Sequence, residues 1–223
     1  MGAAVAATLQ GLGAEVVGLD VNEPADHALA QFVPVDLRSP EAIRGAAEAV
    51  SGPIDALFNC AGVSAGAGLP AEDVFTINFT GMRELTEALL PKFADDGAIC
   101  FVSSLAALNY AENRTRAENI LKLDWNGVDE YVSAHPDEIK ISSVYPFAKE
   151  CVIWYSKHLL PRLVPQRIRT NCIVPGTTST PFLDGTMARE ETRRSVESFP
   201  YVFGRQATAQ EQANVMVFLN SSA

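Results

Sequence analysis

The sequence predicts an α/β fold built on a doubly wound parallel sheet. Short runs that are apolar throughout alternate along the chain with longer segments whose apolar residues recur at helical spacing. Strands of a parallel sheet are covered on both faces, so they are apolar throughout instead of alternating. The chain also opens with a helix followed by a strand, which is half of a βαβ unit.

Length and composition suit one domain over residues 1–223. The chain is 48% hydrophobic and 20% charged, which is ordinary for a globular fold. A net charge of −10 without any run of lysine or arginine argues against nucleic acid or an anionic membrane as a partner, so we expect a small-molecule ligand. No Lys or Arg precedes Arg38, and no apolar run reaches the ~18 residues of a membrane span.

Cysteine usage favours the cytoplasm. The four cysteines are widely spaced and form no CxxC pair, which favours buried reduced thiols over disulfides or a metal site. The histidines, His27, His135 and His158, have no partner at metal-ligand spacing, so no metal is expected.

The first half of the chain is expected to hold three strands and three helices. Ser39, Pro40 and Glu41 are a typical helix start, with a cap, a first-position proline and an acid in the first turn. The expected elements are a helix over 2–12 ended by Gly13, strands over 14–20 and 32–35, a helix over 39–50, a strand over 54–58 and a long helix over 72–93.

The second half has a looser pattern. After a strand over 97–102, residues 105–143 are expected to form an insertion with one helix around 117–123. A helix from about 145 to 163 and a strand over 168–174 follow, and the polar, broken stretch 177–200 is a candidate substrate lid. Thr208 and Glu211 predict a capping box that opens a last helix, ending at Leu219.

The chain is organised around Tyr145 and Lys149. Four residues apart on a helix, they project from one face, and a cation near a phenol with an ordinary pKa of about 10 favours the phenolate. Tyrosine can then act as an acid/base group. The same spacing could also be a surface pair that arises by chance, so its companions must decide.

Those companions occur in a fixed order along the chain. Asp20 ends a strand, Asn59-Cys60-Ala61-Gly62 follows another, Asn78 lies in the next helix, Ser104 ends a further strand, and Pro175-Gly176 follows Tyr145 and Lys149. With this set the sequence resembles the short-chain dehydrogenase/reductase family over nearly its whole length. The long gap between Ser104 and Tyr145, and the Phe203-Gly204-Arg205 stretch, resemble the branch of 3α-hydroxysteroid dehydrogenase/carbonyl reductase and coniferyl-alcohol dehydrogenase.

The resemblance implies a Rossmann-like fold and hydride transfer between an alcohol and a carbonyl, on a steroid or aromatic type of substrate. Tyr145 would be the general acid/base, and Lys149 would lower its pKa and bind the nicotinamide ribose. Ser104 would hold the substrate oxygen, and Asn78 would position a water in a proton relay.

The resemblance also implies a nicotinamide cofactor. Asp20 would accept hydrogen bonds from the adenosine ribose and repel a 2′-phosphate, which selects NAD over NADP, although an acid can also merely end a strand. Asp36 and Leu37 resemble the adenine-contacting pair, with Asp36 equally able to be a turn residue. The remaining cofactor-binding candidates are Gly2, Asn59, Ala61, Gly62, Tyr145, Lys149, Pro175, Gly176, Thr178 and Thr180.

Two parts of the family pattern are not found in the sequence. The first strand with its glycine-rich loop should precede the first helix, and of that loop only Gly2 is recognised; a last strand should follow Leu219. Two hypotheses therefore compete: a dehydrogenase whose sequence is incomplete, or a non-catalytic binding or scaffolding protein with a decayed cofactor site. The intact set of Asn78, Ser104, Tyr145 and Lys149 favours the enzyme. The acidic insertion predicts a homodimer, because it would cover the helices through which most members form tetramers.

Overall fold

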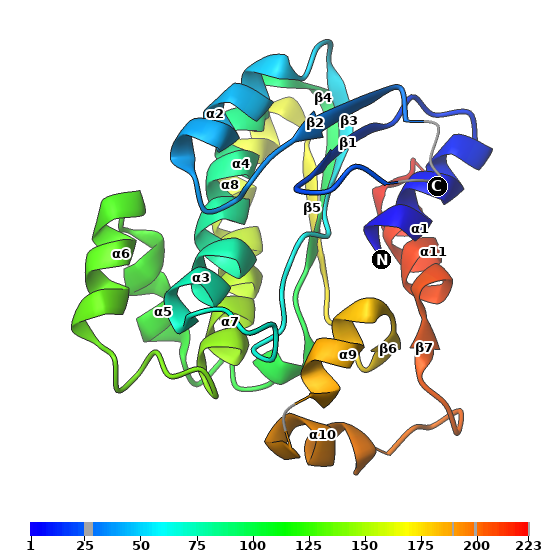
Figure 1. Cartoon of the computed structure of the whole chain (residues 1–223). Helices are drawn as coiled ribbons and strands as arrows, with labels where there is room; N and C mark the ends of the chain where they lie inside the picture. Colours follow the sequence, from blue (N-terminus) through cyan, green and yellow to red (C-terminus); the bar gives the residue numbers. More distant parts are fainter. Residues whose placement is uncertain (25–28, 189, 199, 223) are drawn as a thin grey trace.

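The computed structural model describes residues 1–24, 29–188, 190–198 and 200–222. Its central layer is parallel, as predicted, and Figure 1 shows the strands side by side. One sheet has the order β3-β4-β5 and a second consists of β1 and β2. Among the described residues, no ladder hydrogen bonds join β1 to β3. The strand bounds are Val17–Asp20 (β1), Gln31–Pro34 (β2), Ile54–Asn59 (β3), Phe93–Val102 (β4) and Arg169–Ile173 (β5).

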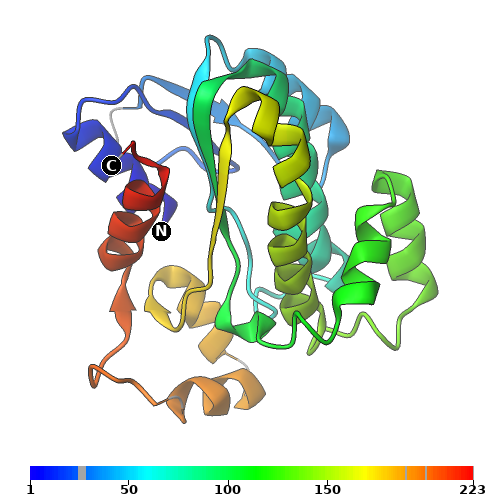
Figure 2. The ribbon, with the colours of Figure 1, turned by 180° about the vertical axis from the view of Figure 1, so that it is seen from behind.

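Helices cover both faces of this layer. On one side lie α2 (Pro40–Ala49), α4 (Gly81–Leu89) and α7 (Val144–His158), and on the other α1 (Gly2–Gly11) and α11 (Ala209–Asn220) (Figures 1 and 2). Strand β4 contributes to a hydrophobic cluster on each face of the sheet. Ile99 and Phe101 belong to the cluster under α7, whereas Cys100 and Val102 belong to the cluster under α1 and α11. This is why β4 is apolar at successive positions.

The long helix expected over 72–93 is present but not regular. It consists of α3 (Ala71–Phe75), the π-helical segment η1 (Thr76–Thr80), α4, and the 3-10 turn η2 (Leu90–Lys92). Gly81, at the start of α4, lies against the backbone of Leu37, because a Cβ built there would be 2.0 Å from the Leu37 carbonyl oxygen. The helix and the loop after β2 can therefore approach only through a glycine.

The insertion is more ordered than predicted. One helix was expected around 117–123, but the structure has two, α5 (Arg114–Leu121) and α6 (Trp125–Ala134), after a short 3-10 turn, η3 (Leu105–Ala107). Helix α6 was missed because its start resembles a turn; in the structure the Asp124 side chain accepts a hydrogen bond from the Gly127 N–H at 2.8 Å and caps it. Its Val128 and Val132 are buried in the core cluster under α7.

The segments between β5 and α11 lie below the sheet in Figure 1. After α7 come α8 (Leu160–Leu163) and the turn η4 (Val164–Gln166). The stretch expected to be broken holds β6 (Thr178–Ser179), α9 (Pro181–Met187) and α10 (Glu190–Glu197), and β6 pairs with β7 (Ala207–Thr208). The predicted capping box between Thr208 and Glu211 is confirmed. No helix of the described residues is long and apolar enough to cross a membrane.

Candidate active site

The sequence-predicted site residues lie where the parallel strands end. Asp20 closes β1, Asp36 and Leu37 follow β2, and the Asn59–Gly62 turn begins at the end of β3. Ser104 lies two residues after the end of β4, and the Leu105 N–H donates to the Pro175 carbonyl at 2.9 Å, which extends the contact between β4 and β5 beyond the strands. Carboxyl ends of parallel strands share one edge, the usual ligand edge of such sheets.

Lys149 is held at both ends by residues of β4 and its exit. Its Nζ donates a 3.0 Å hydrogen bond to the Val102 carbonyl, and its own carbonyl accepts a 2.7 Å bond from Ser103 Oγ. Only 5% of Lys149 is exposed, and this burial lowers its pKa to about 8, against the opposing influence of the Cys172 and Cys60 sulfurs. The sequence did not single out Ser103 as a site residue. Its position between a buried strand and Ser104 was the feature that could have indicated it.

Tyr145 lies one turn before Lys149 on α7, with Lys149 Nζ 5.7 Å from the centre of its ring. Burial raises the pKa of the phenol to about 12, and a side-chain hydrogen bond with Ser104 only partly opposes this. In the protein alone, burial therefore decides the direction of this pKa shift, and the lowering of the Tyr145 pKa by Lys149 stays a prediction. The Lys149 ammonium is hydrogen-bonded to the Val102 carbonyl, and burial has the largest effect on the Tyr145 pKa.

Asn78 sits in the π-helical segment and binds the loop after β3. Its Nδ2 donates to the Val63 carbonyl at 2.9 Å and to the Val74 carbonyl at 2.8 Å, and its Oδ1 accepts from the Val63 N–H at 3.3 Å. A Cβ added to Gly62 would be 2.7 Å from Asn78 Oδ1 and 3.5 Å from Lys149 Nζ. Gly62 thus brings the turn against both side chains, and a π segment at this position is typical of functional sites.

Two features of the Asn59–Gly62 turn fit a bound nicotinamide dinucleotide. Asn59 Nδ2 is buried and has no hydrogen-bond partner among the described residues, so a donor is available to a ligand. Gly2, the first residue of α1, lies beside the turn, since a Cβ added to it would be 3.3 Å from Cys60 Cβ. The turn and the start of α1 therefore border one place at the edge of the sheet, where small residues allow close approach.

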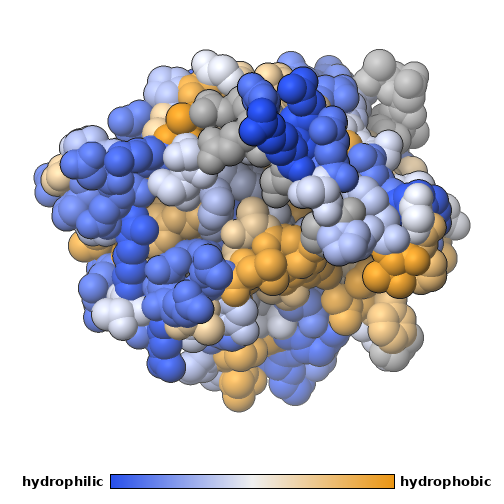
Figure 3. Space-filling view, turned by 90° about the horizontal axis from the view of Figure 1, so that it is seen from below, coloured by the Kyte–Doolittle hydropathy of each residue, from blue (hydrophilic) through white to orange (hydrophobic). Residues whose placement is uncertain are grey.

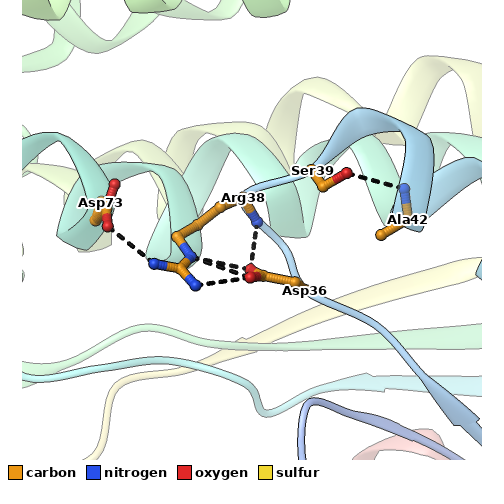
Figure 4. A network of polar contacts seen from close by, with 5 residues as sticks. All are labelled: Asp36, Arg38, Ser39, Ala42 and Asp73. Carbon is orange, nitrogen blue, oxygen red and sulfur yellow. Dashed lines mark hydrogen bonds and ion pairs between the residues drawn. The ribbon is translucent and has the colours of Figure 1, made fainter.

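The loop after β2 is fixed by an arginine between two carboxylates (Figure 4). Arg38 binds Asp36 through Nε at 3.0 Å and NH2 at 2.7 Å, and binds Asp73 of α3 through NH1 at 3.0 Å. The Arg38 N–H also donates to Asp36 at 2.9 Å, and the Arg38 side chain lowers the pKa of Asp36. Asp36 thus makes the contacts of a turn residue, one of the two roles predicted for it, while its contact with adenine stays a prediction; Leu37 beside it is buried.

The other predicted cofactor residues have local partners. Asp20 is exposed, and its Oδ1 accepts a 3.0 Å bond from the Asn22 N–H. Thr178 Oγ1 donates to the Gly176 carbonyl at 3.1 Å, and Thr180 Oγ1 donates to the Thr178 carbonyl at 3.4 Å. These hydroxyls shape the loop after β5.

A metal site is not found in the described part of the chain, where no three His, Cys, Asp or Glu side chains gather to hold an ion. His27 lies outside the described residues. The cysteines, all in the described part, are free thiols, as expected.

Comparisons with known proteins match the whole chain. The short chain dehydrogenase family model matches residues 1–115, and a second, described as enoyl-(acyl carrier protein) reductase, matches residues 130–223. Coniferyl-alcohol dehydrogenase of a Pseudomonas strain is 29% identical over 98% of this chain and 84% of its own length. The 3-alpha-hydroxysteroid dehydrogenase/carbonyl reductase of Comamonas testosteroni is 26% identical over 100% and 86%.

Solved structures agree with these relatives. The 3-alpha-hydroxysteroid dehydrogenase from Pseudomonas sp. B-0831, complexed with NADH, superposes with a TM-score of 0.84 and 25% identity over 99% of this chain and 85% of that one. A short chain dehydrogenase from Burkholderia cenocepacia in complex with NADP has a TM-score of 0.70 at 21% identity, over 99% and 85%, and supports the fold alone.

Proposed function

This chain belongs to the short-chain dehydrogenase family, and from that premise we propose that it is an NAD-dependent enzyme interconverting an alcohol and a carbonyl. The family makes it an oxidoreductase that uses a nicotinamide dinucleotide. The observation that carries the finer proposal is the convergence of Tyr145, Ser104, Lys149 and Asn78 beside the Asn59–Gly62 turn.

In the proposed reaction Tyr145 exchanges a proton with the substrate oxygen, and Ser104 holds that oxygen beside the phenol. A nicotinamide held beside Tyr145 and Lys149 would supply or accept the hydride. A phenol pKa of about 12 keeps Tyr145 protonated at neutral pH, which suits proton donation during carbonyl reduction. Lys149, buried beside it, supplies positive charge, and Asn78 holds the loop that closes this region.

The residues proposed to hold the cofactor are those of the strand ends. Asp20 would bind the adenosine ribose and exclude a 2′-phosphate, which favours NAD. The orphaned Nδ2 of Asn59 and the close approach at Gly62 support placing the dinucleotide over this turn. The remaining proposed contacts are Gly2, Asp36, Leu37, Ala61, Tyr145, Lys149, Pro175, Gly176, Thr178 and Thr180.

The proposed substrate is a ring-bearing alcohol or ketone of steroid or aromatic type. The names of two relatives, coniferyl-alcohol dehydrogenase and 3-alpha-hydroxysteroid dehydrogenase, support this choice. The face seen from below, toward which β3, β4 and β5 end, has hydrophobic side chains near its middle with hydrophilic ones around them (Figure 3).

The experiment is an oxidation screen of steroid, aryl and aliphatic alcohols with NAD, comparing the parent with Tyr145→Phe. The parent should turn over at least one ring-bearing alcohol, and the variant should retain NAD binding but lose a factor of ~10² or more in kcat. Equal rates in the two proteins would refute the role of Tyr145.

A non-catalytic binding or scaffolding role is the second candidate. One observation favours it: the β1–β2 pair is not hydrogen-bonded to β3 in the described residues, which leaves the nucleotide side without a continuous sheet. The same samples decide, because this role predicts no turnover of any alcohol by the parent.

We further propose a cytoplasmic homodimer made of one domain with an insertion at about 105–143. The insertion is fastened to α7, where the Arg116 guanidinium lies 3.7 Å from the Phe147 ring centre and Asn113 donates to Glu150 at 2.9 Å. It therefore covers part of the helix surface through which most family members are expected to form tetramers. Light scattering should show a dimer, and a tetramer joined through α4 and α7 would refute the idea.

A further inference from the structure

Phe182, in the first turn of α9, covers one side of Tyr145. The two ring centres are 5.7 Å apart and the planes meet at 47°. At this separation aromatic rings are in direct contact. A substrate cannot occupy the same side of the phenol unless the Phe182 ring moves.

Helix α9 is lightly anchored, so such a movement has a small free-energy cost. None of its seven residues, all of which the structure describes, is buried, and no side chain caps its start at Thr180. Segments with few buried contacts shift most readily. In Figure 1, α9 lies directly below the carboxyl ends of β3, β4 and β5.

Gly185 sets how closely α9 lies on the neighbouring loop. A Cβ added there would be 2.7 Å from Ser64 Oγ, in the loop that follows the Asn59–Gly62 turn. Glycine at position 185 thus lets α9 lie close enough to this loop for Phe182 to reach Tyr145 from the same helix. The position of the Phe182 ring depends on this contact as well as on its own packing.

When a substrate displaces Phe182, the contact between the Phe182 and Tyr145 rings is lost. A flat ring next to the reacting carbon can replace that contact by packing against Phe182 itself, whereas a short aliphatic chain cannot. The displacement therefore penalises small aliphatic alcohols more than ring-bearing ones.

We propose that Phe182 is a specificity-determining residue, whose ring holds the place beside Tyr145 that a ring-bearing alcohol or ketone takes when it binds. This inference rests on the proposed dehydrogenase function and names the side chain that selects the substrate class.

The first test compares kcat/KM for 1-phenylethanol and for 2-butanol in the parent, in Phe182→Ala and in Phe218→Ala. Phe218, on α11, is 63% exposed and serves as the matched control. Phe182→Ala should lower the ratio of the aromatic to the aliphatic value by roughly tenfold, the upper range for one aromatic contact, and Phe218→Ala should leave it unchanged. An unchanged ratio in Phe182→Ala would overturn the proposal.

A second pair of variants moves the ring without removing it. Gly185→Ala should push α9 off Ser64 and lower the same ratio, and Ser64→Ala combined with Gly185→Ala should restore it, because the clash involves the Ser64 hydroxyl. A double variant as impaired as the single one would contradict this account of α9.

A spectroscopic titration of tyrosine ionisation needs no substrate. Difference spectra against Tyr145→Phe isolate the Tyr145 phenol, whose pKa of about 12 in the parent reflects burial. Phe182→Ala should lower that pKa by admitting water, and an identical titration would overturn the inference. Absence of turnover by the parent would instead count against the dehydrogenase proposal and leave this titration as the test of Phe182.

Discussion

The β3-β4-β5 sheet and the β1-β2 pair are held in different ways. At the end of β4, hydrogen bonds hold the catalytic candidates in place. Ser103 and Val102 are hydrogen-bonded to Lys149, and the segment after β4 is hydrogen-bonded to the segment after β5. At the ends of β1 and β2 the carboxylate of Asp20 is exposed, and the loop is held by Arg38 and Asp73 and by the fit of Gly81 on Leu37.

The two regions differ in how firmly their side chains are fixed. Buried, hydrogen-bonded groups have one arrangement available, which suits proton transfer on the β3–β5 side. Exposed charges are screened and mobile, so Asp20, on the β1–β2 side, would act on the cofactor through its carboxylate charge and not through a fixed position. Substitutions on each side should differ accordingly.

The largest effect is expected at Lys149. Lys149→Met should lower kcat by about a thousandfold, within the range for removing part of a proton-transfer unit, while retaining the fold. Steady-state kinetics with a ring-bearing alcohol measures it. A Lys149→Met enzyme within tenfold of the parent would contradict the assignment.

The same variant provides a control through stability against pH. Lys149 has a folded pKa of about 8, below its ordinary value, so between about pH 8 and 10 the unfolded chain binds more protons than the folded one. Stability from this group therefore rises with pH in that window, and Lys149→Met should remove the rise. Denaturant melts at pH 7.5 and 9.5 give the free energy of unfolding of the parent and of Lys149→Met. Subtracting the two cancels the contributions of the buried phenols and thiols, which change with pH in the opposite direction.

The next largest effect is expected at Gly81, where α4 lies against the loop after β2. Gly81→Ala places a Cβ 2.0 Å from the Leu37 carbonyl oxygen, so the free energy of unfolding should fall by about 3 kcal/mol or more. Gly45→Ala, in α2 where an added Cβ meets nothing within 4 Å, should instead stabilise by about 0.5–1 kcal/mol. Urea denaturation of both variants tests the contrast, and similar midpoints would show that the loop yields.

A smaller effect is expected from Asp20. Asp20→Ser should reduce the preference for NAD over NADP by roughly ten- to a hundredfold, because an exposed carboxylate repels a phosphate through screened charge. Glu15→Ser, an exposed acid before the other end of β1, is the control and should leave the preference unchanged. A parent that already prefers NADP would contradict the proposed role of Asp20.

The smallest effect is expected from Ser103. Ser103→Ala removes one buried hydrogen bond to the Lys149 carbonyl, so it should lower stability by about 1 kcal/mol. Ser51→Ala, at an exposed position, should stay within about 0.5 kcal/mol of the parent. Equal melting curves for the two variants would show that the bond contributes little.

Local patterns were enough to predict the carboxyl ends of β1 to β5 to within one residue and the caps of two helices. The Ser39 side chain accepts from the Ala42 N–H as its position before Pro40 predicts, and Thr208 and Glu211 form their box. Features that depend on distant partners could not be predicted. Asn78, in the π-helical segment η1, binds Val63, 15 residues away in the sequence, and the raised pKa of Tyr145 follows from its burial by distant segments; neither can be inferred from residue spacing.

The widened turn at Thr76–Thr80 limits which changes of length the chain tolerates. A π segment holds one residue more than an α-helix of the same span, and each residue turns a helix by about 100°. Deleting one residue there would leave an α-helix of the same span, so α3 and α4 would keep their orientation and Met82, Leu85 and Leu89 would stay in the core they fill. We therefore expect a single-residue deletion in this turn to be tolerated by the fold better than one within α4, but to move Asn78 away from the Val63 carbonyl.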